Sequence, residues 1–232
     1  MQTTLENSVT FSGVGLHSGK LANLTLKPAP VNHGILFKRL DIVLGNPLVR
    51  ARWDYVSDTT LSTRLKNEDG TMVSTVEHLM AALAGCGVTN ALIELDTEEV
   101  PILDGSAAPF VKGILEVGLN HISSSSRIIK IIKPVIFKNE FGWARLSPHQ
   151  CPEMEYFIEF DDRAIGIQSK TLNMSNGSFV KELSSSRTFC SSKDVETMRE
   201  NGLALGGNYS NALVFEDDKV LSPGGMRHQD EA

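Results

Sequence analysis

The stretch from Ser74 to Leu95, STVEHLMAALAGCGVTNALIEL, joins a predicted helix to a predicted strand. A helix is predicted from about Thr75 to Leu83 or Ala84, and Gly85 and Gly87 then end it. The short apolar run from Asn90 to Leu95 predicts a strand directly after it. Since a single helix and a single strand follow each other closely, the sequence predicts a mixed fold at this point.

The rest of the chain extends this mixed pattern. Further strands are predicted at residues 8–11, 21–26, 35–38, 128–137, 143–146, 155–160 and 212–216. Further helices are predicted at residues 107–117, 179–183 and 194–201. Runs of strands with a few helices favour the α+β class over a doubly wound α/β sheet.

A run of four serines in His121-Ile-Ser-Ser-Ser-Ser-Arg127 predicts a boundary, because it contributes nothing to a core. We expect two domains, residues 1–122 and 127–232, each a β-sheet layered with helices. Only 16 residues follow the last predicted strand, so the second domain is expected to be incomplete by a helix. An apolar sheet face would then be exposed and would favour association.

Composition excludes several classes of protein. The formal charge is −6, with 9 basic and 13 acidic residues up to Ser126 and 13 and 15 after it, so neither half has the basic excess of a nucleic-acid binder. Three cysteines without CxxC spacing favour a reduced, cytoplasmic protein. The sequence shows no signal peptide and no run of about 18 apolar residues, so we do not expect an integral membrane protein.

The segment Ser74-Thr-Val-Glu-His78 allows two interpretations. The pattern alone favours a capping box, in which Glu77 accepts an unpaired backbone N–H at the helix start. The alternative is a carboxylate beside a metal-ligating imidazole, in which His78 binds zinc and Glu77 takes a proton from bound water.

A catalytic zinc site usually has three protein ligands, and spacing does not reveal the other two. Only His149 and Glu153 have a helical i, i+4 spacing with a carboxylate, and Pro148 and Pro152 argue against a helix there. His228 lies beside Asp230 and Glu231, but their spacing suits a solvated tail better than a defined site. A serine or cysteine hydrolase is disfavoured, because the chain has no G-x-S-x-G motif.

Two further segments contain glycines whose backbone conformation can be interpreted. Asp104-Gly105 predicts a tight turn, and Ser106 is a plausible cap for the helix that follows. The segment Gly202-Leu-Ala-Leu-Gly-Gly-Asn208 is predicted to bring backbone close to a ligand, because glycine has no Cβ. It lacks the GK[ST] ending of a phosphate-binding P-loop.

Taken together, the motifs resemble the UDP-3-O-acyl-N-acetylglucosamine deacetylase family, and they occur in the family's order over nearly the whole chain. They are Gly13-Val-Gly-Leu-His-Ser-Gly-Lys20, Ser74-Thr-Val-Glu-His-Leu79, Ala81-Ala-Leu-Ala-Gly85, Pro101-Ile-Leu-Asp-Gly-Ser-Ala-Ala-Pro-Phe110, Ser186-Arg-Thr-Phe189 and Leu205-Gly-Gly207. The resemblance implies two α+β domains with the active site between them.

The resemblance also implies an activity, namely Zn²⁺-dependent hydrolysis of the 2-acetamido group of UDP-3-O-(3-hydroxyacyl)-N-acetylglucosamine, releasing acetate, in lipid A biosynthesis. On this mapping His78 is a zinc ligand, Glu77 is the general base for metal-bound water, and Thr188 helps to hold the oxyanion. The residues that map to the substrate and acyl-chain passage are Thr60, Leu61, Phe189, Asp194, Val195, Ala204, Gly207 and Ala212.

In the family, the segment matched by residues 225–232 runs into a helix with an H-K-x-x-D motif, which supplies the other two zinc ligands. A later G-H motif supplies a further histidine, and both motifs lie beyond Ala232. We therefore expect this chain to bind zinc weakly and to have little or no deacetylase activity. The alternative is a non-catalytic remnant of the same family that binds nucleotide sugar or acyl chains.

Overall fold

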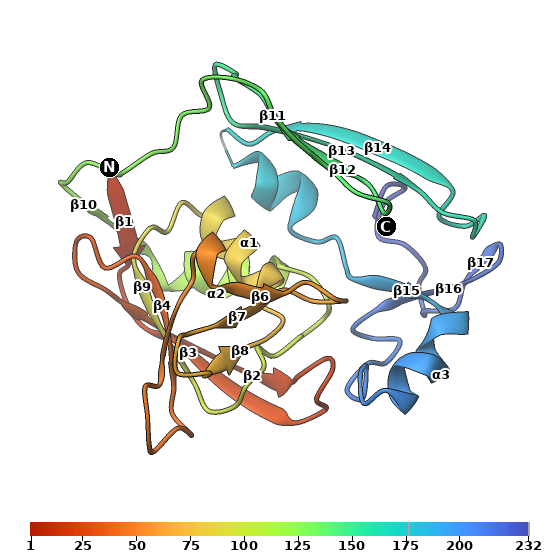
Figure 1. Ribbon diagram of the computed structural model, residues 1–232, viewed down its shortest axis with the longest axis horizontal. Coiled ribbons are helices and arrows are strands. Elements are labelled where there is room, and N and C mark those ends of the chain that lie inside the picture. The colour runs from red at the N-terminus through yellow and green to blue at the C-terminus, as the bar shows by residue number, and fades with distance from the viewer. Residues whose placement is uncertain (176, 232) are drawn as a thin grey trace.

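The computed structural model describes residues 1–175 and 177–231, and its sheets with a few helices confirm the α+β class (Figure 1). The largest sheet has five strands in the order β2-β3-β9-β4-β5. Strand β9 lies antiparallel to β3 and parallel to β4. Their bounds are β2 Val9–Val14, β3 Leu21–Pro28, β4 Ile35–Arg39, β5 Leu48–Arg50 and β9 Ala91–Leu95.

Helices α1 (Glu77–Gly85) and α2 (Ala108–Val117) pack against each other and share the core of this sheet. Alternate side chains of β3 are buried, as the period of two along a strand requires, and Leu24 and Leu26 are fully covered. Phe110 of α2 meets Phe11 of β2 edge to face, with ring centroids 4.9 Å apart. The first half of the chain therefore has a contiguous apolar core.

The N-terminal strand was missed by the sequence prediction, as were several short strands. Strand β1 (Gln2–Leu5) pairs antiparallel with β10 (Leu119–Ile122), so the two ends of the first half lie side by side. The serine run continues this contact, because Gln2 donates hydrogen bonds to Ser124 and Ser125. A smaller sheet contains β6 (Val56–Asp58), β7 (Arg64–Lys66) and β8 (Met72–Val73), preceded by a helical turn, η1 (Trp53–Tyr55).

The second half consists of two separate hairpins and one small sheet. Strand β11 (Val135–Lys138) pairs with β12 (Trp143–Leu146), and β13 (Glu153–Glu159) pairs with β14 (Ile167–Asn173). The small sheet has β16 (Leu213–Glu216) between β15 (Phe189–Ser191) and β17 (Lys219–Val220). Two helical segments, η2 (Phe179–Leu183) and α3 (Ser192–Glu200), complete this half.

The predicted strand at residues 128–137 is wrong over most of its length, because a strand begins only at Val135. Its apolar side chains lack a partner layer, and Ile128, Ile129 and Ile132 are all more than 80% exposed. Phe137 and Trp143 of the β11–β12 hairpin are also exposed. The expected exposed apolar face is present, while the division into two domains remains a prediction.

Several close contacts join the two halves. Phe179 of η2 lies over Gly85, where an added Cβ would come within 2.0 Å of the phenyl ring. An added Cβ on Gly105 would lie equally close to the Asn211 carbonyl oxygen, and Ser106 forms a β-bridge with Arg187. The motifs quoted from the two halves are therefore brought together at one junction.

The capping-box interpretation of Ser74 and Glu77 is wrong. Helix α1 begins at Glu77, two residues later than predicted, and its cap position has no side-chain hydrogen bond. The Glu77 carboxylate instead accepts the Thr63 N–H at 3.0 Å, and the Ser74 hydroxyl accepts the Arg64 Nε–H. Glu77 is thus held in the first turn of the helix by a neighbouring loop, without serving as a cap.

Candidate active site

A pocket of about 340 Å³ lies at the start of α1, between the two halves of the chain, and we call it the polar pocket for the charged side chains in its lining. Glu77 and His78 line it from α1, and the segment Ser186–Phe189 lines it from the second half. Its other lining residues are Tyr156, Leu183 and Glu231. A carboxylate in the first helical turn is stabilised by the unpaired N–H groups there.

His78 is largely buried, and burial lowers the pKa of its imidazole below the ordinary value. The nearby carboxylates of Glu77 and Asp104 oppose this shift, because they favour the imidazolium. The lowered pKa keeps the ring neutral at neutral pH. A neutral imidazole offers a nitrogen lone pair to a metal ion.

Asp104 is fixed by the turn that the sequence predicted. Its Oδ1 accepts hydrogen bonds from the Ser106 N–H and hydroxyl, and its Oδ2 accepts one from Arg227 at 2.9 Å. Burial raises the pKa of Asp104, but these hydrogen bonds outweigh it and hold that pKa below its usual range. Ser106 also accepts the Ala108 N–H at 3.2 Å, but the cap position of α2 is Ala107, one residue later than predicted, and it has no side-chain hydrogen bond.

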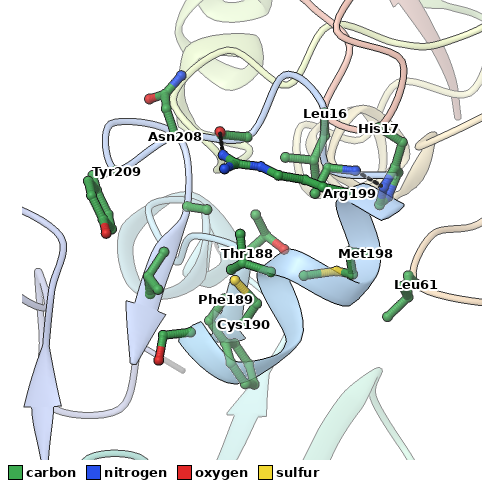
Figure 2. A pocket seen from close by; sticks show the side chains of 16 residues that line it. Leu16, His17, Leu61, Thr188, Phe189, Cys190, Met198, Arg199, Asn208 and Tyr209 are labelled. Atoms are coloured by element: carbon green, nitrogen blue, oxygen red, sulfur yellow. Dashed lines mark hydrogen bonds between the residues drawn. The ribbon is translucent and has the colours of Figure 1, made fainter. Parts of the chain in front are cut away.

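An apolar cavity of about 400 Å³ adjoins the polar pocket (Figure 2). In Figure 2, Thr188, Phe189 and Cys190 lie centrally, with Met198 and Leu61 on one side and Asn208 and Tyr209 on the other. The cavity is bounded by α3, β15 and the loop before β16. Thr188 and Phe189 line both spaces, so the polar pocket and the apolar cavity are neighbours at these two residues.

Most residues mapped to the passage by resemblance meet in this cavity. Those lining it are Leu61, Phe189, Val195, Ala204, Gly207 and Ala212. Two others do not line it. Thr60 is exposed, with its N–H bonded to Asp58, and Asp194 is exposed in the first turn of α3. The structure therefore gives Thr60 and Asp194 no place in either space.

The Gly202–Asn208 segment, which was predicted to approach a ligand, lines the cavity over only part of its length. Gly207 lines the cavity, but Gly206 packs on the chain itself, because an added Cβ would lie 2.2 Å from the Gly15 carbonyl oxygen. The Gly206 N–H donates to Leu16, and the Leu205 N–H donates to His17. These bonds join the loop to the Gly13–Lys20 motif, which the sequence predicted as a turn-rich link.

Glu99 is a buried residue that the sequence interpretation missed. Its carboxylate accepts the His17 and Ser18 N–H groups and the Thr75 hydroxyl, at 2.8–2.9 Å. Burial raises the pKa of Glu99, but these hydrogen bonds outweigh it and lower that pKa below the ordinary value. The Glu99 carboxylate thereby joins His17 and Ser18, beside the cavity, to Thr75, which lies two positions before Glu77. No sequence pattern marked it.

Four residues near the site have a left-handed backbone conformation although they are not glycine. Leu61, Thr75, Leu103 and Ala204 all have φ between 52° and 59°. Each such residue costs about 1–3 kcal/mol, and strain of this kind is common where side chains must be aimed precisely at a ligand. Leu61 and Ala204 line the cavity, Thr75 lies two positions before Glu77 of the polar pocket, and Leu103 directly precedes Asp104.

Whether the described residues could hold a catalytic zinc ion depends on which side chains can act as ligands. His78 supplies an imidazole and Glu77 a carboxylate, both of which are zinc ligands in proteins. Over residues 1–175 and 177–231, however, no three His, Cys, Asp or Glu side chains are grouped to hold a metal ion. The described residues therefore do not by themselves fit the usual three-ligand site.

The cysteines do not provide a nucleophile in this pocket. Burial raises the pKa of the Cys190 thiol, and it raises that of Cys86 to about 11. Both are therefore thiols at neutral pH, and only a thiolate is an effective nucleophile. This agrees with the absence of a cysteine-hydrolase motif.

The fold and site define an α+β protein whose carboxylate–imidazole pocket lies beside an apolar cavity. No helix in the described part of the chain has both the length and the apolar character needed to cross a bilayer. A family model described as "LpxC: UDP-3-O-acyl N-acetylglycosamine deacetylase" matches residues 2–232, and the chain belongs to this family.

Several curated relatives carry the name UDP-3-O-acyl-N-acetylglucosamine deacetylase. The proteins from Idiomarina loihiensis and Shewanella halifaxensis are each 44% identical to this chain over 234 residues. The protein from Chromohalobacter salexigens is also 44% identical. In each case the match covers 99% of this chain and 76% of the relative.

Proposed function

We propose that this chain hydrolyses the 2-acetamido group of UDP-3-O-(3-hydroxyacyl)-N-acetylglucosamine, releasing acetate, in lipid A biosynthesis. The observation that carries the proposal is the meeting of the two spaces at Thr188 and Phe189. A substrate with a fatty acyl chain beside a reacting amide needs an apolar channel that ends at a polar site. Each methylene buried there contributes about 0.8 kcal/mol.

The proposed chemistry assigns a role to each residue of the polar pocket. Glu77 takes the proton from the attacking water, because it is the carboxylate that lines the pocket from the first turn of α1. Thr188 donates its hydroxyl to the developing oxyanion. Leu61, Phe189, Val195, Ala204, Gly207 and Ala212 hold the acyl chain, as their place in the cavity favours.

We propose Zn²⁺ as the cofactor, with the neutral His78 imidazole as one ligand. A bound zinc ion would supply Lewis-acid polarisation of the amide carbonyl. Because the described residues do not complete three ligands, the chain is expected to hold zinc weakly and to have little or no deacetylase activity without added Zn²⁺. The cytoplasm is the proposed compartment, since all three cysteines are unpaired.

The experiment is to dialyse the chain against zinc-free buffer, measure zinc by elemental analysis, and then add substrate. The account predicts well below one zinc per chain, binding of the UDP-linked sugar by calorimetry, and slow acetate release that added Zn²⁺ increases. One tightly held zinc per chain with rapid turnover would contradict the weak-zinc prediction. Binding with no acetate release at any zinc concentration would favour the non-catalytic remnant, for which the incomplete donor set is the supporting observation.

A further inference from the structure

Three successive residues of the segment before Thr188 are each bonded to the tail at residues 225–231. Arg227 donates to the Ser185 carbonyl at 2.8 Å, and His228 is hydrogen bonded to the Ser186 hydroxyl at 3.2 Å. Arg187 is held by Glu231. We call Arg227, His228 and Glu231 the tail clamp.

The bond between Glu231 and Arg187 is the most buried part of the clamp. The Glu231 carboxylate accepts Arg187 Nε–H at 2.7 Å, Nη2–H at 3.0 Å and the backbone N–H at 3.2 Å. The two side chains are 0% and 7% exposed. One carboxylate therefore fixes both the main chain and the side chain of Arg187, and buried charge-assisted bonds of this kind are strong.

Thr188 follows Arg187 directly, and its own backbone is fixed at both ends. Its N–H donates to the Gly105 carbonyl at 2.8 Å, and its carbonyl accepts the Leu213 N–H at 2.9 Å. Its side chain lies where the two spaces meet. Among the described residues the Thr188 hydroxyl has no hydrogen-bond partner, so it is free to donate to a ligand.

We propose that Glu231 is a positioning residue for the deacetylation site. By holding Arg187 on two sides it sets the direction of the Thr188 hydroxyl toward the reacting amide. The inference rests on the proposed function for the role of Thr188, but the geometric coupling of Glu231 to Thr188 can be measured without turnover. A displacement of about 1 Å in a catalytic group can cost a hundredfold in rate.

The test is a double-mutant cycle on Glu231→Gln and Thr188→Val, with acetate release as one readout. Glu231→Gln is expected to lower kcat by about tenfold to a hundredfold and to leave KM unchanged. In the Thr188→Val background it should have no further effect, because the group it positions is already gone. Asp217→Asn is the matched control, since Asp217 forms an exposed ion pair with Lys193 at 2.8 Å.

The second readout is the methyl resonance of Thr188 in protein labelled with ¹³C-methyl threonine, assigned by its loss in Thr188→Val. Glu231→Gln should move this resonance, and Asp217→Asn should leave it in place. Should Glu231→Gln fail to fold, Arg187→Lys replaces it, because lysine keeps the charge but loses the two-pronged contact.

An unchanged Thr188 resonance in the folded variant, or equal losses of kcat with and without the Thr188 hydroxyl, would overturn the positioning role. Absence of acetate release by the unmutated chain would count against the proposed function. In that case the methyl resonance still decides whether Glu231 positions Thr188, so the two failures are distinguishable.

Discussion

The buried apolar core of residues 1–122 is much larger than that of residues 127–231. Among the described residues, the main core cluster draws all its fully buried members from the first region, apart from Phe179. The second region has a cluster of only Ile165, Leu213 and Phe215. Glu77 and His78 thus stand on a well-packed layer. Phe189 packs against the small second cluster, and Thr188 is hydrogen bonded to Gly105 across the junction.

The site therefore depends on how residues 127–231, which have only a small core, are attached to residues 1–122. Two-stranded hairpins are marginally stable on their own in water, and β11–β12 is such a hairpin with every residue exposed. Contacts such as Phe179 on Gly85 must therefore fix the second region against the first. Each prediction below changes one side of this contrast.

Hydrogen exchange is expected to give the largest difference. Amides of β3 and β9 should open only with global unfolding, while those of β11 and β12 should open at a free energy lower by about 5 kcal/mol or more. Native-state exchange followed by NMR measures both sets in one sample. Equal protection of the hairpin and the central sheet would refute the contrast.

Phe179→Ala is expected to cost about 3–5 kcal/mol in the free energy of unfolding, because it leaves a cavity over Gly85. Denaturant titration with matched m-values measures the loss. Phe157→Ala is the control, since Phe157 is 59% exposed and its removal should change stability by about 0.5 kcal/mol or less. Equal losses in the two variants would show that Phe179 does not anchor the second region.

Glu99→Gln is expected to cost about 1–3 kcal/mol at neutral pH, because an amide cannot accept all three hydrogen bonds. The folded-state pKa of Glu99 lies below the ordinary value of 4.5, so its stabilisation is present above that value. The stabilisation is lost as the pH falls through the lowered pKa. The melting temperature of the variant should therefore depend less on pH in the acid range, and an unchanged acid dependence would count against this role.

Phe137→Lys is expected to have the smallest effect on stability, about 0.5 kcal/mol or less, because Phe137 is 66% exposed. It should nevertheless reduce self-association, since it removes part of the exposed apolar face. Sedimentation velocity at several concentrations measures the change. Leu44→Lys, at an exposed position of the first region, should leave association as it was.

The sequence predicted those elements whose pattern is local. Helix α2 and strands β9 and β12 lie within a residue of their predicted bounds, and glycine marks one end of two of them, Gly118 after α2 and Gly142 before β12. Strand β1 was missed, because its pairing with β10 joins residues more than a hundred positions apart. Residues 128–134 were predicted as strand from their composition, but no neighbouring strand pairs with them in the described structure.

The residues of the candidate site also fall into those with a local sequence signal and those without one. Glu77 and His78 stood out as a pair, yet their chemistry was assigned only through resemblance. Glu99 gave no local signal, and the prediction that Glu231 lies in a solvated tail is wrong, because its side chain is buried against Arg187. The roles of both residues depend on partners far away in the chain, such as His17 and Arg187. Distant hydrogen bonds of this kind follow from tertiary structure, and spacing alone does not reveal them.

The most direct measurement of the central claim is acetate release from UDP-3-O-(3-hydroxyacyl)-N-acetylglucosamine with Zn²⁺ in excess, comparing the unmutated chain with Glu77→Gln. The account predicts slow but measurable release by the unmutated chain and a loss of about a hundredfold or more in the variant. Calorimetric binding of the substrate should be nearly the same for both. Equal rates of acetate release by the two proteins would contradict the claim that Glu77 is the base of a deacetylation site at this junction.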